Sequence, residues 1–219
     1  MKKIKFFTIC LLSIVAMAVN AQTTKGWDGV RVSYNSFTFD SEFRNFDAVS
    51  GLEVGYVKSF PISKKLPLYL ETGASLLWVA GDLYDYSEAE EDYISIDKAS
   101  VNMASLIIPA NVGYKYDIDD NFSVFPYAGA YLKLNIVGKM ETELYETNAG
   151  VVSEDESSDM DMFDKDEGDG DRLQVGLQIG ATLNYKETYN LGISYGFDIN
   201  EVMKKVDSSK FAVTLGYNF

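Results

Sequence analysis

The feature that most constrains the fold of this chain is a strict alternation of apolar and polar residues, which is clearest in its last segment. There, every second side chain is large and apolar: Phe211, Val213, Leu215, Tyr217 and Phe219. Successive side chains of a β-strand point to opposite faces, so this period of two predicts a strand with one apolar face. Terminal residues usually fray into water, where a large apolar side chain is unfavourable. The presence of Phe219 there therefore indicates that its side chain contacts an apolar environment.

The same period recurs along most of the chain, and the sequence shows no amphipathic-helix period after residue 21. It predicts eight strands, near residues 27–38, 49–59, 66–80, 99–117, 122–139, 172–186, 188–200 and 209–219. Short connections alternate with long ones, and the long ones are residues 39–48, 81–98, 140–171 and 201–208. Four hairpins with short turns at one end and long loops at the other predict an all-β fold, an eight-stranded antiparallel up-and-down barrel.

The first 21 residues have the character of a secretory signal peptide. A lysine-rich start precedes an apolar run from residue 6 to 19, and Val19 and Ala21 are the small residues of a cleavage site. Fourteen apolar residues are too few to cross a bilayer as a helix. We therefore expect export, cleavage after Ala21 and one barrel domain over residues 22–219.

The polar face of the last three predicted strands separates a membrane barrel from a soluble one. It consists of Gly, Asn, Gln, Ser and Thr with one Asp, whereas a soluble exterior carries Lys and Glu. The opposite face is a continuous aliphatic band that ends in aromatic residues, as lipid-facing walls do. We expect a transmembrane barrel in the outer membrane, with a soluble lipocalin-like binding barrel as the alternative.

Aromatic residues at the predicted strand ends support the membrane interpretation. If the first strand starts in the periplasm, six of them fall at the periplasmic rim: Tyr114, Tyr116, Tyr185, Tyr189, Tyr217 and Phe219. Trp78 and Phe197 then fall toward the outer rim. Aromatic girdles at both interfaces are typical of outer-membrane barrels.

The segment SLIIPANVGYKY, from Ser105 to Tyr116, resembles the Bacteroidetes-type outer-membrane β-barrel family of porin-like and PorT-like proteins. The shared pattern is an Ile-Pro step before an aliphatic strand that ends in aromatic-Lys-aromatic, here Tyr114-Lys115-Tyr116. The alternation that ends at Phe219 resembles the C-terminal signature read by the barrel-assembly machinery. These resemblances imply an outer-membrane location, with outer-membrane lipid and that machinery as partners, and the likeness to small OmpA-like and OmpX-like barrels is architectural only.

Acidic residues outnumber basic ones by 33 to 19, a net charge of −14 that becomes −17 when three leader lysines are removed. Such a surface repels nucleic acid and anionic membrane faces. The excess is concentrated in residues 82–97 and 141–171, and the second stretch holds thirteen Asp and Glu beside the single Lys165. We interpret both stretches as parts of hydrophilic surface loops, the second within an acidic loop at 140–171.

The composition argues against catalysis. The sequence contains no histidine, and its single cysteine, Cys10, lies in the leader, so imidazole bases, Ser–His activation and imidazole metal sites are absent. We expect a non-enzymatic structural or surface-binding barrel, monomeric and without a cofactor, whose surface ligand the sequence does not name. The alternative function is a narrow passive pore for small solutes, and a lipid-modifying enzyme would have to act without histidine.

Six aspartates of the second acidic stretch could supply oxygen ligands to a weak divalent-cation site: Asp159, Asp161, Asp164, Asp166, Asp169 and Asp171. An EF-hand loop requires Gly at position six and Glu at position twelve, but counting from Asp164 these positions are Asp169 and Val175. The motif therefore fails, and a solvated, self-repelling loop is the competing interpretation.

Strand parity places five charged residues on the face opposite the apolar band: Arg31, Glu53, Glu71, Lys115 and Lys133. Isolated charges in a narrow interior are costly, so we predict an ion-pair network among them, with Glu71 and Lys115 on adjacent strands and Asp198 as a further acid. Four bulky inward residues favour a lumen plugged by side chains: Tyr69, Phe125, Tyr127 and Tyr131. An incomplete network would leave a thin aqueous path.

Overall fold

The computed structural model describes residues 25–219 except 42–45, 91–92, 149–150, 165–169 and 204–205. This part contains ten strands, in chain order β1 (Asp28–Ser41), β2 (Val49–Pro61), β3 (Leu68–Glu90), β4 (Tyr93–Tyr114), β5 (Tyr116–Asp117), β6 (Phe122–Asn148), β7 (Val151–Asp161), β8 (Leu173–Tyr185), β9 (Tyr189–Asp198) and β10 (Val206–Asn218). Within it, no helix is long and apolar enough to cross a membrane. The predicted signal peptide and its cleavage site lie outside the described residues.

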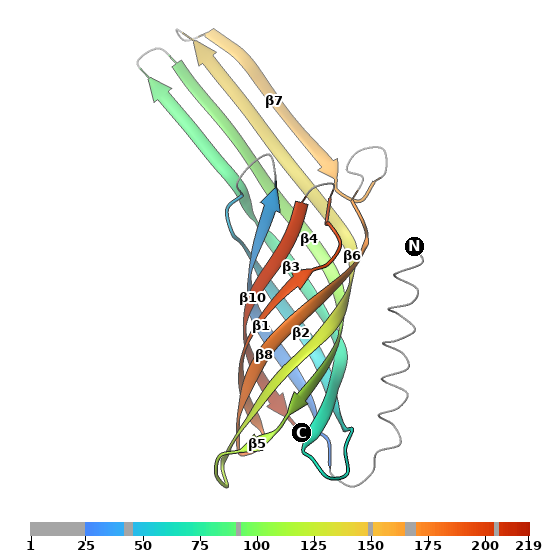
Figure 1. Ribbon diagram of the computed structural model, residues 1–219. Helices are drawn as coiled ribbons and strands as arrows, with labels where there is room; N and C mark the ends of the chain where they lie inside the picture. Colours follow the sequence, from blue (N-terminus) through green and yellow to red (C-terminus); the bar gives the residue numbers. More distant parts are fainter. Residues whose placement is uncertain (1–24, 42–45, 91–92, 149–150, 165–169, 204–205) are drawn as a thin grey trace.

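Eight strands close into one antiparallel ring, in the order β1, β2, β3, β4, β6, β8, β9, β10 and back to β1 (Figure 1). The first and last strands pair from Gly29 with Asn218 to Ser41 with Val206. Beyond this ladder, the backbone N–H of Phe219 donates a hydrogen bond of 2.9 Å to the carbonyl of Asp28. The predicted eight-stranded up-and-down barrel is confirmed, and its last strand closes it.

Outward and inward side chains alternate along the wall as the period of two predicted. In β10 and just after it, the outward Phe211, Leu215 and Phe219 are 48%, 64% and 71% exposed, whereas the inward Lys210 and Ala212 are buried. Exposed large apolar side chains occur on all eight strands of the ring. A continuous apolar exterior of this extent suits hydrocarbon rather than water.

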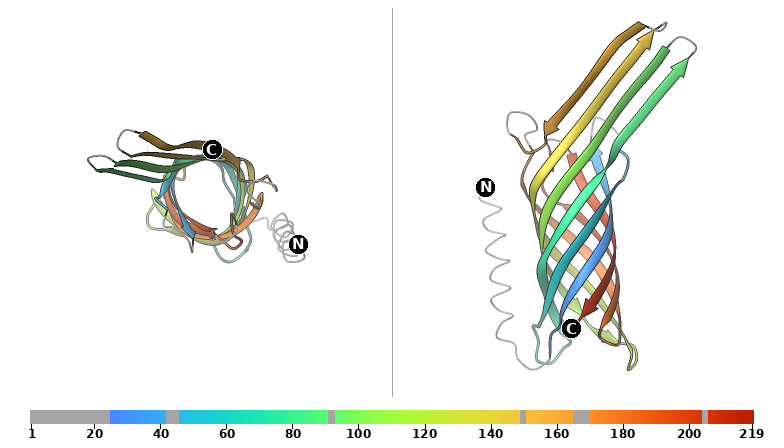
Figure 2. Two further views of the ribbon diagram at one scale, coloured as in Figure 1. Left: turned by 90° about the horizontal axis from the view of Figure 1, so that it is seen from above. Right: turned by 180° about the vertical axis from the view of Figure 1, so that it is seen from behind.

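The barrel has a short-turn end, where both the C-terminus and β5 lie, and an opposite end from which strands project (Figures 1 and 2). At the short-turn end, Tyr189 of β9 is the register partner of both Tyr185 and Tyr217. Its ring lies 5.8 Å from that of Tyr217, and the ring of Phe122 lies 5.0 Å from that of Tyr185. These tyrosines therefore form part of one outward-facing aromatic rim.

The prediction of loops at 81–98 and 140–171 was wrong for most of their length. β3, β4 and β6 continue past the barrel, and β7 adds a fourth strand beside β6, so that a four-stranded sheet projects from one side of the ring (Figures 1 and 2). We call this the projecting sheet, and it comprises residues 82–90, 93–100, 139–148 and 151–161. The β4–β6 ladder runs on into it as far as Tyr93 opposite Asn148.

The difference has a physical cause, because acidic residues do not by themselves prevent a strand. A strand is held by its backbone ladder, and acidic side chains are compatible with it where both faces meet water. The sequence around Ile94 and Ile96 keeps the period of two through the acidic stretch. β-Bulges at Asp82/Tyr84 and Ala104/Ser105 lie near the point where the strands leave the ring, and bulges bend a strand away from its neighbours.

Candidate functional site

Apolar side chains fill the lumen at the end from which the projecting sheet rises. We call them the mouth cluster, and its buried members are Phe37, Phe39, Val49, Leu77, Val79, Leu83, Ala99, Val101, Met103, Ile107, Tyr131, Met162, Phe163 and Val202. Most come from inward positions of the wall, whereas Met162, Phe163 and Val202 come from the connections beside β7 and β9. The cluster thus packs as a protein core does and excludes water from this end.

Three aromatic rings pack together at the other end of the lumen. The ring of Trp27 lies 4.8 Å from that of Tyr69 and 5.3 Å from that of Phe125. Trp27 precedes β1 and is fixed by Ser59, whose N–H donates to its carbonyl at 2.8 Å, and its indole N–H donates to Glu71 at 3.2 Å. These hydrogen bonds therefore hold the indole of Trp27 at this end of the lumen.

Between these two ends, bulky inward side chains lie on glycines of the neighbouring strand. Tyr131 stands opposite Gly176, and Tyr127 stands opposite Gly180. A Cβ at Gly176 would lie 2.1 Å from the ring of Tyr131, and one at Gly180 would lie 2.5 Å from the hydroxyl of Tyr127. Glycine is needed at both positions because the opposite side chain occupies the space, so the small residues of the polar face and the large ones fill the lumen together.

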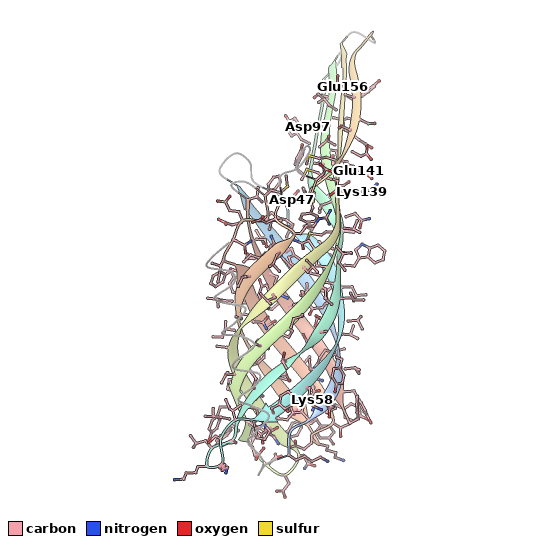
Figure 3. The ribbon with its side chains drawn as sticks, turned by 90° about the vertical axis from the view of Figure 1, so that its right-hand side faces the viewer. Asp47, Lys58, Asp97, Lys139, Glu141 and Glu156 are labelled. Atoms are coloured by element: carbon pink, nitrogen blue, oxygen red, sulfur yellow. The ribbon has the colours of Figure 1, made fainter. Side chains whose placement is uncertain are left out.

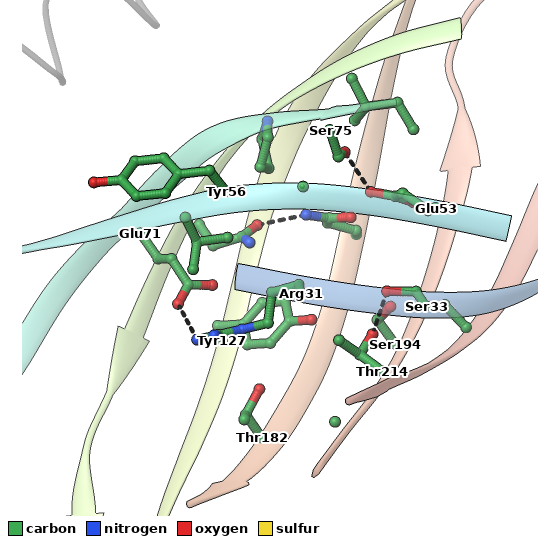
Figure 4. Close-up of a pocket in the computed structure, with 18 of the residues that line it drawn as sticks. Arg31, Ser33, Glu53, Tyr56, Glu71, Ser75, Tyr127, Thr182, Ser194 and Thr214 are labelled. Atoms are coloured by element: carbon green, nitrogen blue, oxygen red, sulfur yellow. Dashed lines mark hydrogen bonds and ion pairs between the residues drawn. The ribbon is translucent and has the colours of Figure 1, made fainter. Parts of the chain in front are cut away.

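A polar cavity of about 90 Å³ remains between the mouth cluster and the rings of Trp27, Tyr69 and Phe125 (Figure 4). Charged and phenolic side chains that line it include Arg31, Glu53, Glu71, Tyr127 and Lys210, and hydroxyl, amide and small apolar groups line the rest. A cavity of this polarity and size suits ordered water. We call it the chamber.

Two ion pairs border the chamber, and each joins strands that are not neighbours. Arg31 of β1 lies 3.7 Å from Glu71 of β3, and Lys210 of β10 lies 3.4 Å from Glu53 of β2. Glu53 also accepts a hydrogen bond of 2.5 Å from the hydroxyl of Ser75. These contacts bridge β1–β3 and β10–β2 across an intervening strand, so they fix the shape of the wall.

A third ion pair lies deeper, where Lys133 of β6 meets Asp198 of β9 at 2.5 Å. Both side chains are almost fully buried, at 3% and 0% exposure. Asp198 also accepts hydrogen bonds from the hydroxyls of Tyr131, at 2.8 Å, and Ser208. This aspartate is therefore fully partnered, as a buried charge must be to be tolerated.

The five residues predicted to share one network are not all brought together. Arg31 pairs with Glu71, but Lys115 does not meet Glu71; its ammonium group lies 2.5 Å from Glu187 and 3.6 Å from Asp117 near the short turns. Burial there acts to lower the pKa of Lys115, but the two carboxylates outweigh it and hold that pKa above its usual value. Lys115 lies beyond the end of β4 and four residues past Asn111, the register partner of Glu71, so its position along the strand places it at the rim.

Sequence reasoning missed Lys210, which lies in the lumen and pairs with Glu53. Its parity matches that of Ala212 and Thr214 on the polar face of the last strand, so the same alternation could have identified it. With Lys210 included, three cations pair with three anions: Arg31, Lys133 and Lys210 with Glu71, Asp198 and Glu53. Charge inside the wall is balanced, in contrast to the acidic excess of the whole chain.

The projecting sheet carries the unbalanced charge (Figure 3). Glu141 of β6 is the register partner of Asp159 of β7, which places two acids side by side. Lys98 lies 3.5 Å from Asp82 and is opposite Glu143 in the β4–β6 ladder. Among the side chains of this sheet that the structure describes, exposed acids outnumber bases, and water screens them.

The six aspartates predicted as a weak cation site do not lie in one loop. Asp159 and Asp161 belong to β7 and are exposed, and Asp164 and Asp171, also exposed, lie in the connection to β8. Asp166 and Asp169 lie outside the described residues. In the part that the structure describes, no group of three or more acidic side chains is placed to hold a metal ion.

The predicted assembly signature lies on the outward face of β10 and just beyond it. All five side chains are exposed: Phe211, Val213, Leu215, Tyr217 and Phe219. They share that face with the apolar band of β9, through the register pairs of Phe211 with Tyr195 and Leu215 with Leu191. They are thus accessible from the membrane side of the wall.

Comparison with known proteins agrees with this architecture. Residues 7–219 match the family described as outer membrane protein beta-barrel domain, and the chain belongs to that family. The search of curated proteins found no match. The family places the protein in the outer membrane and decides against the soluble lipocalin-like alternative, whereas the narrower Bacteroidetes-type resemblance stays a prediction.

Among solved structures, the chain is similar to Ail, the attachment invasion locus protein of Yersinia pestis, with 13% identity, a TM-score of 0.42 and coverage of 90% of this chain and 100% of that one. It is also similar to Neisserial surface protein A, with 15% identity, a TM-score of 0.40 and coverage of 90% and 100%. A de novo designed transmembrane β-barrel is similar at 13% identity and a TM-score of 0.40, with coverage of 91% and 100%.

Proposed function

We propose that this protein is a non-enzymatic outer-membrane scaffold that holds an acidic sheet above the cell surface on a plugged barrel. One observation carries the proposal: the mouth cluster packs at one end of the lumen, and the rings of Trp27, Tyr69 and Phe125 pack together at the other. Small outer-membrane barrels have short periplasmic turns and long extracellular connections, which orients the projecting sheet outward.

The projecting sheet is the part of the scaffold that can meet a partner. The exposed acidic side chains that the structure describes there include Asp85, Glu143 and Glu156, so a partner that the sheet attracts must present positive charge. Recognition through such a surface weakens with salt, since the charges lie in water. Membrane lipid surrounds the wall, and the assembly machinery reads β10 during insertion.

A trimmed variant tests this function. Replacing residues 86–97 and 143–157 each by Asn-Gly closes both hairpins with two-residue turns, at the register pairs of Asp85 with Lys98 and Thr142 with Ser158. We expect the trimmed barrel to assemble normally but to lose salt-sensitive binding of a lysine-rich peptide to proteoliposomes. Equal binding by the full and trimmed proteins would contradict the proposal.

Orientation needs a separate experiment. An epitope inserted between β6 and β7 should be stained by antibody on intact cells, because this hairpin is the far tip of the projecting sheet (Figure 1). An epitope in the short turn between β8 and β9 should be stained only after lysis. The reverse pattern would place the sheet in the periplasm and overturn the proposed role.

A narrow passive pore is the second candidate, and the chamber is the observation in its favour. The chamber is polar and lies within the lumen, but apolar and aromatic side chains close both of its ends. Conduction would need both ends to open at once. The closed geometry therefore favours the scaffold.

A further inference from the structure

The methionines of the chain are distributed very unevenly. Five of the seven follow residue 24, and all five lie at the mouth of the barrel: Met103, Met140, Met160, Met162 and Met203. Met103 and Met162 belong to the buried mouth cluster, Met140 and Met203 pack against it, and Met160 is the register partner of Met140. The short-turn half of the barrel has none among its described residues.

Three of these side chains surround one small cavity of about 30 Å³ in the mouth cluster: Met140, Met162 and Met203. They come from three separate parts of the chain, namely β6, the connection after β7 and the connection before β10. The other six side chains that line the cavity are aliphatic or aromatic. The cavity therefore has thioether groups but no side-chain oxygen or nitrogen in its wall.

The backbone holds two of these methionines in place. The N–H of Met162 donates to the carbonyl of Gly138 at 3.0 Å, and its own carbonyl accepts from Gly170 at 3.0 Å. The carbonyl of Met203 accepts from Val206 at 2.9 Å, while Met140 lies within the β6 ladder. Backbone hydrogen bonds thus hold the three residues that line the cavity at their places in the fold.

The chemistry of the cavity indicates its ligand. A space of this volume can hold a body the size of a water molecule, but water would find no hydrogen-bonding side chain there. Thioethers are soft, polarizable ligands, which favour Cu(I) over hard divalent cations and need no deprotonation. We propose that Met140, Met162 and Met203 form a binding site for a soft monovalent cation, Cu(I) or its analogue Ag(I).

The acidic surroundings support the access of a cation to this site. Asp161 and Asp164 flank Met162 in sequence and are exposed, and the projecting sheet rises beside the mouth. A strongly negative surface raises the local concentration of cations. The carboxylates attract a cation, and the thioethers decide which kind is retained.

The competing interpretation is that flexible methionines simply fill gaps in an apolar core. Met103 provides the comparison, because it is 1% exposed in the same mouth cluster but does not line the cavity. Leucine matches methionine in volume and lacks sulfur, so methionine-to-leucine variants keep the packing and remove the ligand. A metal site depends on Met140, Met162 and Met203 but not on Met103, whereas simple gap filling would make all four methionines equivalent.

The test uses the full mature chain refolded in detergent micelles, with folding checked by heat-modifiable gel migration. Ag(I) is added in chloride-free buffer, native mass spectrometry gives the stoichiometry and calorimetry gives the affinity. We expect one Ag(I) per chain, and in protein labelled with ¹³C at the methionine methyl groups we expect the signals of Met140, Met162 and Met203 to shift most. An excess of Ca²⁺ should not compete.

Variants decide the proposal. Loss of an outer-shell partner already weakens metal binding about 10- to 100-fold, so Met140→Leu, Met162→Leu or Met203→Leu should each weaken it at least about tenfold. The triple variant should not bind, and Met103→Leu should bind as the unmodified protein does. The proposal is overturned if the unmodified protein takes up no stoichiometric Ag(I), if the folded triple variant binds equally well, or if Ca²⁺ displaces the ion.

Discussion

Charged residues occur in two regions of this molecule, and the two regions handle them in opposite ways. Inside the wall, each of three cations meets one anion, and the deepest pair, Lys133 with Asp198, is almost fully buried. On the projecting sheet, acids outnumber bases, and Glu141 stands beside Asp159 with no base between them. The first arrangement requires partners, and the second requires only water.

The difference teaches that charge by itself does not tell a strand from a loop. A charge in a narrow interior is stable only when it is paired and hydrogen-bonded, whereas a charge on a two-sided wet sheet has little effect on the backbone ladder. Substitutions in the lumen should therefore be costly, and substitutions of the same type on the projecting sheet should be mild.

The largest effect is expected for Lys133→Met, which leaves the buried carboxylate of Asp198 without its cation. Loss of one partner of a buried pair costs about 3–5 kcal/mol of unfolding free energy. Urea unfolding in phospholipid vesicles, followed by tryptophan fluorescence, measures the change. Lys133→Met combined with Asp198→Asn should recover most of the loss, because the amide still accepts a hydrogen bond and carries no charge. If the double variant is no more stable than the single one, pairing is not what the site requires.

A second large effect is expected for Gly176→Val, because a side chain at this position collides with the ring of Tyr131. Overpacking of this kind costs about 3 kcal/mol. Gly192→Ala is the matched control on the next strand, where a Cβ would meet nothing closer than 3.3 Å. The same unfolding measurement applies, and equal stability of the two variants would show that the lumen is not packed as described.

A much smaller effect on the barrel is expected when the projecting sheet is trimmed at residues 86–97 and 143–157. The trimmed variant keeps Leu83, Met140 and Met162, so the mouth cluster remains whole. Shortening exposed hairpins should change the unfolding free energy by less than about 1 kcal/mol. A barrel that no longer assembles after trimming would mean that the two regions are not separable.

The smallest effect is expected for Glu141→Lys on the projecting sheet, and it has the opposite sign. The new lysine faces Asp159 across the β6–β7 ladder, and replacing a like-charge pair by an opposite pair stabilises a sheet by roughly 0.2–1 kcal/mol. Hydrogen exchange of the β6 and β7 amides should slow slightly at low salt and not at high salt. Faster exchange in the variant would contradict the electrostatic interpretation.

How far the sequence could predict this structure differs between the same two regions. In the barrel, lipid outside and a narrow lumen inside require apolar and polar side chains to alternate. The strands and their closure therefore follow from parity. So does the inward position of four charged residues: Arg31, Glu53, Glu71 and Lys133. The partners do not follow from parity, because they depend on which strands face one another across the ring. Parity thus predicts that Glu53 faces inward, but it does not identify Lys210 as its partner.

In the projecting sheet, no contact with lipid requires either face to be apolar, and the acidic composition concealed the strands. The lengths of β3, β4 and β6 come from a ladder that the barrel itself starts and that runs on until the chain turns, at Glu90 opposite Tyr93 and at Asn148 opposite Val151. The clustering of methionines at the mouth also could not be predicted, because it arises from one strand and two connections that meet only in the folded chain.

The central claim is that the lumen is closed, and planar-bilayer recording tests it most directly. The refolded, unmodified protein should insert without producing stable conductance steps, because the mouth cluster and the ring of Trp27 close the chamber on both sides. Heat-modifiable migration of the same sample shows that the barrel is folded, and a known porin in the same bilayer shows that channels are detectable. Stable, reproducible open channels from the folded protein would contradict the closed lumen and establish the passive pore in its place.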